Sequence, residues 1–332
     1  MTAQSRIRVA AALGALLAPL AFVAATQSAA EASSARPHDL RMYKVEKYVA
    51  VDGEYPDQSA DVTLKCNTGD YAVDGMWKVD QVDDDYDDWG DRVAGDPKKV
   101  YFYASYSEAN KSDWHFKFFN DNPGRAQVKL WVTCLGGKTD KAFNHTHSIL
   151  LDRYTAAQPL TTATHNYSWS GSCAPDAVEV APGFDFGAPV ATLWGSWPEQ
   201  AAGHAWQWWF DLSADAPSAQ FYVSCLKVKT GPASSGPAHR HNVLYRWKND
   251  KLAPSAEHVS VAARTEEQVS CDDHSKALVG AFYISQPSHV WYLGMEPRIK
   301  TRVFWFGNDG GGDDTVYLNV LCVNDRTSRQ KA

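Results

Sequence analysis

Residues 127–134 read QVKLWVTC, and this stretch has two counterparts, QFYVSC at residues 220–225 and TVYLNVLC at residues 315–322. Apolar and polar side chains alternate along each stretch, and Val, Tyr, Phe, Trp and Thr are enriched. A period of two with this composition predicts β-strands. One strand, ending in the same cysteine, therefore occurs three times.

Other features recur around these strands in the same order. The six cysteines form pairs that are 68, 52 and 51 residues apart, and a glycine follows the first cysteine of each pair by nine or ten residues. An aromatic strand precedes each final strand, at residues 114–119, 206–210 and 303–306. His38 and His145 each lie 28 residues before the first cysteine of a pair, and His241 lies 30 before. We interpret this order as a threefold duplication.

The duplication predicts an all-β protein of three tandem β-sandwich-like repeats. Repeat 1 spans residues 38–140, repeat 2 residues 141–236 and repeat 3 residues 237–332. Six cysteines allow 15 pairings, and the repeat selects one disulfide within each unit, namely Cys66–Cys134, Cys173–Cys225 and Cys271–Cys322.

The N-terminal segment has the pattern of a secretory signal. Arg6 and Arg8 precede an apolar run from Val9 to Ala25, and residues 30–32 read Ala-Glu-Ala, a typical cleavage site. We expect residues 1–32 to be removed, although an uncleaved anchor is the competing interpretation. The mature chain then starts with a free arm, residues 33–37. We expect it to be secreted and not to interact with membranes.

Most of the negative charge lies in one insertion of repeat 1. The chain has 32 basic and 39 acidic residues, a net charge of −7, which argues against nucleic acid as a partner. Residues 80–96, the acidic loop, carry eight aspartates against Arg92, and repeats 2 and 3 have no equivalent. The candidate partner-binding residues here are Asp80, Asp83, Asp84, Asp85, Tyr86, Asp87, Asp88, Trp89 and Asp91.

Three interpretations of the acidic loop remain open. Charge runs are often solvated surface loops that aid solubility. Calcium prefers oxygen ligands, but the spacing is not that of an EF-hand. Aromatic side chains among carboxylates are also typical of an interface that captures a basic protein.

Two histidine pairs are candidate metal ligands. His145 and His147 are one residue apart, as are His239 and His241, so on a strand each pair shares one face and could bind zinc or copper. A third ligand is not apparent, and duplication of a strand-start sequence explains the pairs as well. We therefore expect no metal and no cofactor.

The tryptophans of repeat 2 are candidates for stacking on sugars. Alternation places Trp206 and Trp208 on one face of a strand and Trp209 on the other, and Trp194 and Trp197 lie nearby. The equivalent aromatic residues of the other repeats indicate that the face of Trp206 and Trp208 is core. The glycine-rich residues 307–312 are predicted to form a hairpin turn.

Known catalytic motifs are absent from the sequence. It contains no G-x-S-x-G, no H-E-x-x-H and no Walker loop, so we expect no enzymatic activity.

The signal, the disulfide-pinned β-repeats, the N-terminal strand and the single acidic loop together resemble the adaptor subunit of the umbrella toxin particles that Streptomyces secretes. The resemblance implies an adaptor for interbacterial competition that bridges a large repeat-bearing toxin subunit and a lectin subunit. The acidic loop would enter a basic cleft of the lectin. The N-terminal strand would bind the toxin subunit through Met42, Tyr43, Val45, Lys47 and Val49. The upstream strand also recurs before Cys173 and Cys271, so the alternative is that residues 38–51 form an ordinary strand of repeat 1.

Two expectations for function follow. The first is a secreted, non-catalytic adaptor that joins two other proteins through its first repeat. The alternative is an extracellular glycan-binding or cell-wall-binding protein that uses the tryptophans of repeat 2.

Overall fold

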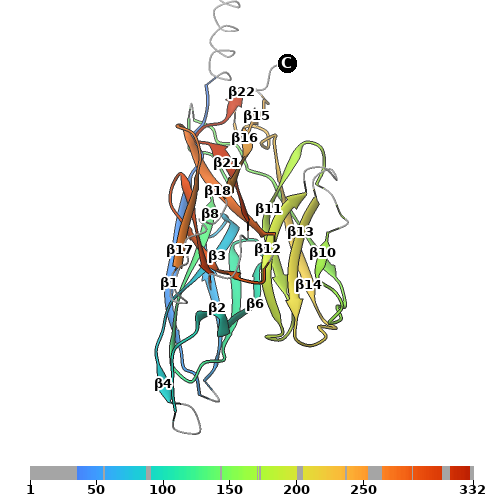
Figure 1. Cartoon of the computed structure of the whole chain (residues 1–332). Coiled ribbons are helices and arrows are strands. Elements are labelled where there is room, and N and C mark those ends of the chain that lie inside the picture. The colour runs from blue at the N-terminus through green and yellow to red at the C-terminus, as the bar shows by residue number, and fades with distance from the viewer. Residues whose placement is uncertain are drawn as a thin grey trace, which may run out of the picture.

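The computed structural model describes residues 36–54, 57–86, 91–142, 144–169, 171, 173–199, 205–235, 238–252, 264–285, 287–308 and 315–329. Within these ranges the protein is built almost entirely of antiparallel β-strands (Figure 1). Repeat 1 contains eight strands and a short 3-10 helix: β1 (Met42–Val51), β2 (Ser59–Lys65), β3 (Tyr71–Val82), β4 (Asp85–Tyr86), β5 (Arg92–Val93), η1 (Pro97–Lys99), β6 (Val100–Ser107), β7 (Asp113–Asn120) and β8 (Ala126–Leu135).

The later repeats contain the same strands without the acidic loop. Repeat 2 consists of β9 (Leu151–Ala157), β10 (Asn166–Ser168), β11 (Ala177–Asp185), β12 (Ala191–Glu199), β13 (Ala205–Leu212) and β14 (Gln220–Lys227). Repeat 3 consists of β15 (His241–Asn242), β16 (Tyr245–Leu252), β17 (Arg264–Ser270), β18 (Ser275–Ile284), β19 (Val290–Pro297), β20 (Thr301–Asn308), β21 (Val316–Asn324) and β22 (Ser328–Arg329). The predicted aromatic strands lie in β7, β13 and β20, and the predicted final strands are β8, β14 and β21.

Each repeat is a sandwich of two three-stranded sheets. In repeat 1 these are β1-β8-β3 and β2-β7-β6, and the other repeats follow the same order. The three predicted disulfides are confirmed: Cys66 is bonded to Cys134, Cys173 to Cys225 and Cys271 to Cys322. The first cysteine of each pair follows β2, β10 or β17, which belongs to one sheet of the sandwich. The second cysteine lies in the last long strand, which is β8, β14 or β21 and belongs to the other sheet of the sandwich. The disulfides indicate an oxidising compartment.

The three sandwiches are joined edge to edge, an arrangement that the sequence left open. β6 pairs with β11, β12 pairs with β18, and β19 pairs with β3. Each repeat therefore gives one half of a six-stranded sheet to each of its two neighbours, and the three sheets form a closed ring. Repeat 3 contacts repeat 1 in the same way as repeat 1 contacts repeat 2.

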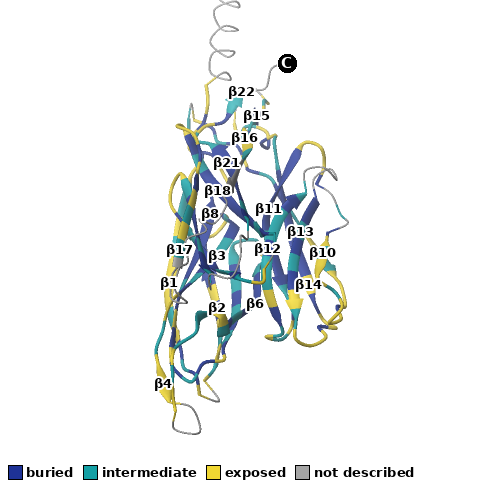
Figure 2. Ribbon diagram, viewed as in Figure 1, coloured by how far each residue is buried: buried dark blue, intermediate teal, exposed yellow. Residues whose placement is uncertain are grey.

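The aromatic residues of the repeats form the core. Trp114, Phe116 and Phe118 in repeat 1 are fully buried, as are Trp206 and Trp208 in repeat 2. This burial confirms that the face shared by Trp206 and Trp208 is core, as Figure 2 shows for the strand interiors.

The recurring glycines lie where strands approach other side chains closely. A Cβ on Gly75 would overlap the indole ring of Trp114, and a Cβ on Gly280 would overlap the sulfur of Met295. A larger residue cannot fit at either position without moving its neighbours.

A buried ion pair links repeat 1 to repeat 3. Arg302 on β20 donates from Nε to Asp74 Oδ2 at 3.1 Å and from a terminal nitrogen to the Leu278 carbonyl at 2.7 Å. The amide of Gly280 also donates to Asp74 Oδ2, at 3.1 Å. Because both charged side chains are buried, the pair holds the two repeats in one relative position.

Candidate functional site

Five histidines from all three repeats meet where the ring of repeats closes. They are His38, His145, His147, His239 and His241, which we call the histidine cluster. The ring centroids of His38, His147 and His241 form a triangle with sides of 4.9, 5.2 and 4.7 Å. All three of these side chains are fully buried.

His38, His147 and His241 hold equivalent positions in the three repeats. The backbone N–H of each donates to a threonine hydroxyl at 3.0 Å, and the backbone N–H of that threonine donates back to the histidine carbonyl at 2.9 Å. The partners are Thr327 for His38, Thr139 for His147 and Thr230 for His241. Each threonine lies five residues after the last cysteine of a repeat, so the end of one repeat fixes the start of the next.

Hydrogen bonds from Nδ1 orient two of these imidazoles. Nδ1 of His38 lies 3.1 Å from the Asp140 carbonyl, and Nδ1 of His147 lies 3.1 Å from the Gly231 carbonyl. Since a carbonyl only accepts, Nδ1 carries the proton in both rings, and Nε2 retains a lone pair. Neither ring nitrogen of His241 has a hydrogen-bond partner within the described residues.

Burial favours the neutral form of His147 and His241. Desolvation, reinforced by the neighbouring histidines, lowers the pKa of His241 to about 4. Burial also lowers the pKa of His147, although the Gly231 carbonyl opposes the shift. A neutral imidazole is the form that coordinates a metal.

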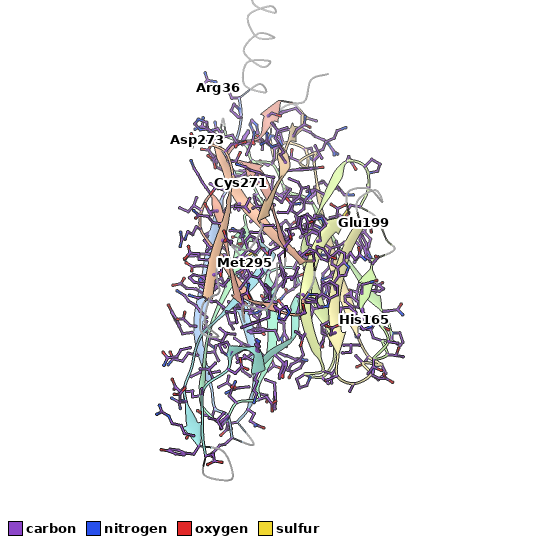
Figure 3. The ribbon with its side chains drawn as sticks, in the orientation of Figure 1. Arg36, His165, Glu199, Cys271, Asp273 and Met295 are labelled. Carbon is purple, nitrogen blue, oxygen red and sulfur yellow. A yellow bond between two sulfur atoms is a disulfide. The ribbon has the colours of Figure 1, made fainter. Side chains whose placement is uncertain are left out.

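His145 and His239 flank the buried triangle, each two residues before its repeat's inner histidine. The equivalent position in repeat 1 is Arg36, which is exposed (Figure 3). Two groups of three histidines have ring nitrogens that all lie within 4.8 Å of one another: His38, His145 and His147, and His147, His239 and His241.

The third ligand that was not apparent in the sequence is thus His38 for one pair, and His147 for the other. The sequence feature that could have revealed the histidine cluster was the recurrence of a histidine before the first cysteine of each repeat. This recurrence did not predict that the histidines meet, because only closure of the ring brings the starts of the three repeats together.

The acidic loop lies at the far end of the molecule from the histidine cluster. β4 and β5 form a separate two-stranded hairpin beyond the end of β3, at the opposite end of the molecule from β15 and β22 (Figure 1). Tyr86 on this hairpin is 66% exposed. Asp87, Asp88 and Trp89 lie outside the described residues.

Some carboxylates of the acidic loop hold its own backbone. Asp84 accepts from the Gly95 amide and from Arg92, each at 3.0 Å, and these contacts lower the pKa of Asp84. Asp96 accepts from the Lys98 amide at the start of η1. Lys78 lies 2.9 Å from Asp80, and Gln81 donates to Asp83. Asp85 and Asp91 are exposed.

The predicted N-terminal partner strand is β1, and it is an edge strand of a six-stranded sheet. β1 is paired with β8 from Met42 to Val51. Tyr43, Val45 and Val49 pack on the core together with Met42, while Lys47 is exposed. The residues of β1 are therefore an integral strand of repeat 1. Of the arm, only Arg36 and Pro37 are described.

A cleft of about 830 Å³ lies beside the start of β1. Met42 and Tyr43 line it on one side, and the turn between β19 and β20 lines it on the other. At that turn Ile299 is 77% exposed.

The tryptophans of repeat 2 do not form an exposed platform. Trp206 and Trp208 are in the core, and Trp194, Trp197 and Trp209 are half-buried. Trp209 packs on Tyr283 of repeat 3, with ring centroids 4.7 Å apart.

Two further predictions concern segments that are only partly described or not described. Residues 1–35, which include the signal, and residues 309–314 of the glycine-rich turn lie outside the described ranges. In the part of the chain that the structure covers, no helix is long and apolar enough to cross a bilayer.

The fold and these surfaces define a disulfide-stapled, all-β protein of three fused sandwiches with one projecting acidic hairpin. No protein-family model matches the chain, and a search of curated proteins finds no relative.

Proposed function

We propose that the protein is a secreted, non-catalytic adaptor that binds one partner through the acidic loop and a second partner at the β1 edge. The main support for this proposal is that the β4–β5 hairpin projects from the end of the three disulfide-bonded sandwiches. A binding element that stands clear of the body can reach into a partner without any rearrangement of the core.

The acidic loop suits a basic partner. Its negative charge would attract a basic surface over long range and speed association. Tyr86 offers an exposed aromatic ring of the kind that anchors interfaces. The contacts of Asp84 and Asp96 with backbone amides hold the base of the loop in place, so less conformational entropy is lost on binding.

The second partner would use the free edge of β1. An edge strand of ten residues offers backbone N–H and C=O groups to an added strand. The cleft between Met42 and Ile299 would receive an apolar side chain of that partner. By the resemblance described above, the partners would be a lectin subunit for the acidic loop and a large repeat-bearing toxin subunit for β1.

The β4–β5 hairpin is separate from the six-stranded sheet whose edge is β1 (Figure 1), so the two proposed binding elements do not share a strand. The half-buried state of Trp194, Trp197 and Trp209 gives no comparable support to the glycan-binding alternative.

The experiment is capture of partners from the culture supernatant of the producing organism, with identification by mass spectrometry. The test variant is Asp85→Asn/Asp87→Asn/Asp88→Asn, which leaves the structural carboxylates of Asp84 and Asp96 in place. The matched control is Asp176→Asn/Asp211→Asn/Asp273→Asn, which removes the same charge from exposed sites in repeats 2 and 3.

We expect the test variant to lose one partner, the control to keep both, and all three proteins to melt at nearly the same temperature. Capture by the test variant that equals the wild type, also at high salt, would refute the role of the acidic loop. Retention of the isolated wild-type chain on polysaccharide would favour the glycan-binding alternative.

A further inference from the structure

We propose that the histidine cluster is a metal site that binds one Zn²⁺ ion per chain, with His147 as a ligand. This site is independent of the adaptor function, and it lies at the opposite end of the molecule from the acidic loop.

The donor atoms favour a transition metal of the zinc class. Both groups of three histidines offer only imidazole nitrogens. Imidazole suits Zn²⁺ and its neighbours in the transition series, whereas Ca²⁺ and Mg²⁺ require oxygen ligands. Three histidines leave a fourth position for water, which is the arrangement of several protein zinc sites.

The distances require only small side-chain movements. A tetrahedral Zn²⁺ with Zn–N bonds of about 2.0–2.1 Å places its nitrogens roughly 3.4 Å apart. The nitrogens of each group lie within 4.8 Å of one another, so each ring has to move by about 1 Å or less. Because both groups include His147, one ion uses either group but two ions do not bind together.

Backbone carbonyls orient two of the rings by accepting from Nδ1, as they commonly do for histidines that bind a metal. The carbonyls of Asp140 and Gly231 accept from Nδ1 of His38 and His147, which fixes the tautomer and leaves Nε2 as the ligand atom. The His241 ring is fully buried, and neither of its nitrogens has a partner within the described residues. A buried polar group without a partner is costly, and coordination would satisfy it.

A bound ion would strengthen the closure of the ring of repeats. His38 lies at the start of repeat 1, and His147 and His241 lie near the starts of repeats 2 and 3. An ion held by His38, His145 and His147 links repeats 1 and 2, and one held by His147, His239 and His241 links repeats 2 and 3. Either ion binds the folded state and therefore raises its stability.

The test uses the untagged mature chain with its disulfides intact. The protein is loaded with ZnSO₄, dialysed against metal-free buffer and analysed for zinc by mass spectrometry, and its melting temperature is measured with and without the ion. We expect one zinc per chain and a rise in melting temperature of several degrees. A zinc content near zero would overturn the proposal.

The first variant is His147→Asn, because the asparagine amide can still donate to the Gly231 carbonyl while the Nε2 ligand is lost. We expect no bound zinc and no rise in melting temperature. The matched control is His165→Asn, at an exposed histidine of repeat 2 (Figure 3), which should bind zinc as the wild type does. Full zinc binding by His147→Asn would overturn the proposal.

A second variant keeps the proposal testable if His147→Asn does not fold. His145→Ala/His239→Ala removes one ligand from each group and leaves the three threonine-anchored histidines in place, so we expect zinc to be lost. X-ray absorption at the zinc edge of the wild type should show a shell with three imidazole ligands. A shell of carboxylate oxygens would place the ion in the acidic loop and would overturn the proposal.

Discussion

The backbone N–H of His38 donates to the side-chain hydroxyl of Thr327, 289 residues further along the chain. The same contact joins His147 to Thr139 and His241 to Thr230, at the same distance of 3.0 Å. Two of these contacts join consecutive repeats, and the third joins the last repeat to the first. The contact that joins each repeat to the next also joins the last repeat to the first, and it thus closes the chain into a ring.

Removing the Thr327 hydroxyl should weaken this closure. Thr327→Val keeps the shape of the side chain but leaves the buried His38 N–H without its acceptor, which costs about 1–3 kcal/mol. The free energy of unfolding by guanidinium chloride, with disulfides intact, measures the effect. Thr139→Val and Thr230→Val should cost similar amounts, and Thr162→Val, at an exposed site, should cost almost nothing. A cost confined to one of the three equivalent positions would contradict the threefold closure.

Removing one partner of the buried Asp74–Arg302 pair should strongly destabilise the fold. Asp74→Ala leaves the buried guanidinium of Arg302 without its carboxylate, and we expect a loss of about 3–5 kcal/mol in the free energy of unfolding. The exposed pair of Asp273 and Lys300 is the control, and Asp273→Ala should leave the free energy of unfolding nearly unchanged. Equal losses for the two variants would show that burial of the pair is unimportant.

The same aspartate should make stability depend on pH. Burial raises the pKa of Asp74 to about 7, even though Arg302 acts in the opposite direction, whereas an unfolded aspartate titrates near 3.9. Between these two values the folded state binds the proton more tightly, so the free energy of unfolding falls as pH rises from about 4 to about 7. Asp74→Asn removes this titration. Its unfolding free energy should therefore decline less than that of the wild type over this range, and identical slopes would contradict the shift.

Gly294 should tolerate no side chain. Its φ is +137°, and a Cβ at this position would overlap the carbonyl of Trp77 on the neighbouring strand β3. This is the point where β19 of repeat 3 pairs with β3 of repeat 1. We expect Gly294→Ala to lower the melting temperature strongly or to prevent folding. Gly69→Ala is the control, because Gly69 also has a positive φ but has open space around it, so it should cost only about 1–2 kcal/mol. Equal effects would mean that backbone conformation alone matters.

Calcium should not stabilise the protein. Asp84 and Asp96 already bind backbone amides, and among the described residues no three carboxylates of the acidic loop have oxygens close enough to share an ion. Addition of CaCl₂ to metal-free protein should leave the melting temperature unchanged. A rise that is abolished by Asp85→Asn/Asp87→Asn/Asp88→Asn would revive the calcium interpretation of the loop.

Much of the fold was predictable because its signals are local. The alternation of side chains in residues 127–134, 220–225 and 315–322 marks strands, since a strand exposes alternate faces. The spacing of the cysteines and of Gly75, Gly183 and Gly280 revealed the repeats, and the repeats selected the correct disulfides among 15 pairings. The position and charge of the acidic loop were likewise visible, because an insertion stands out against its neighbours.

The sequence by itself thus determined the all-β class, the three units, their disulfides and the site of the charged insertion. Only the tertiary structure decided that the units share sheets in a ring, that β1 is an integral edge strand, and that His38 joins His145 and His147. The reason is that edge-to-edge pairing and ring closure depend on contacts between residues far apart in the chain, such as Gly294 with Lys78 and His38 with Thr327. The repeated sequence pattern shows which strands and cysteines each unit contains. The closed ring brings the starts of the three repeats, and with them the histidines, around one point.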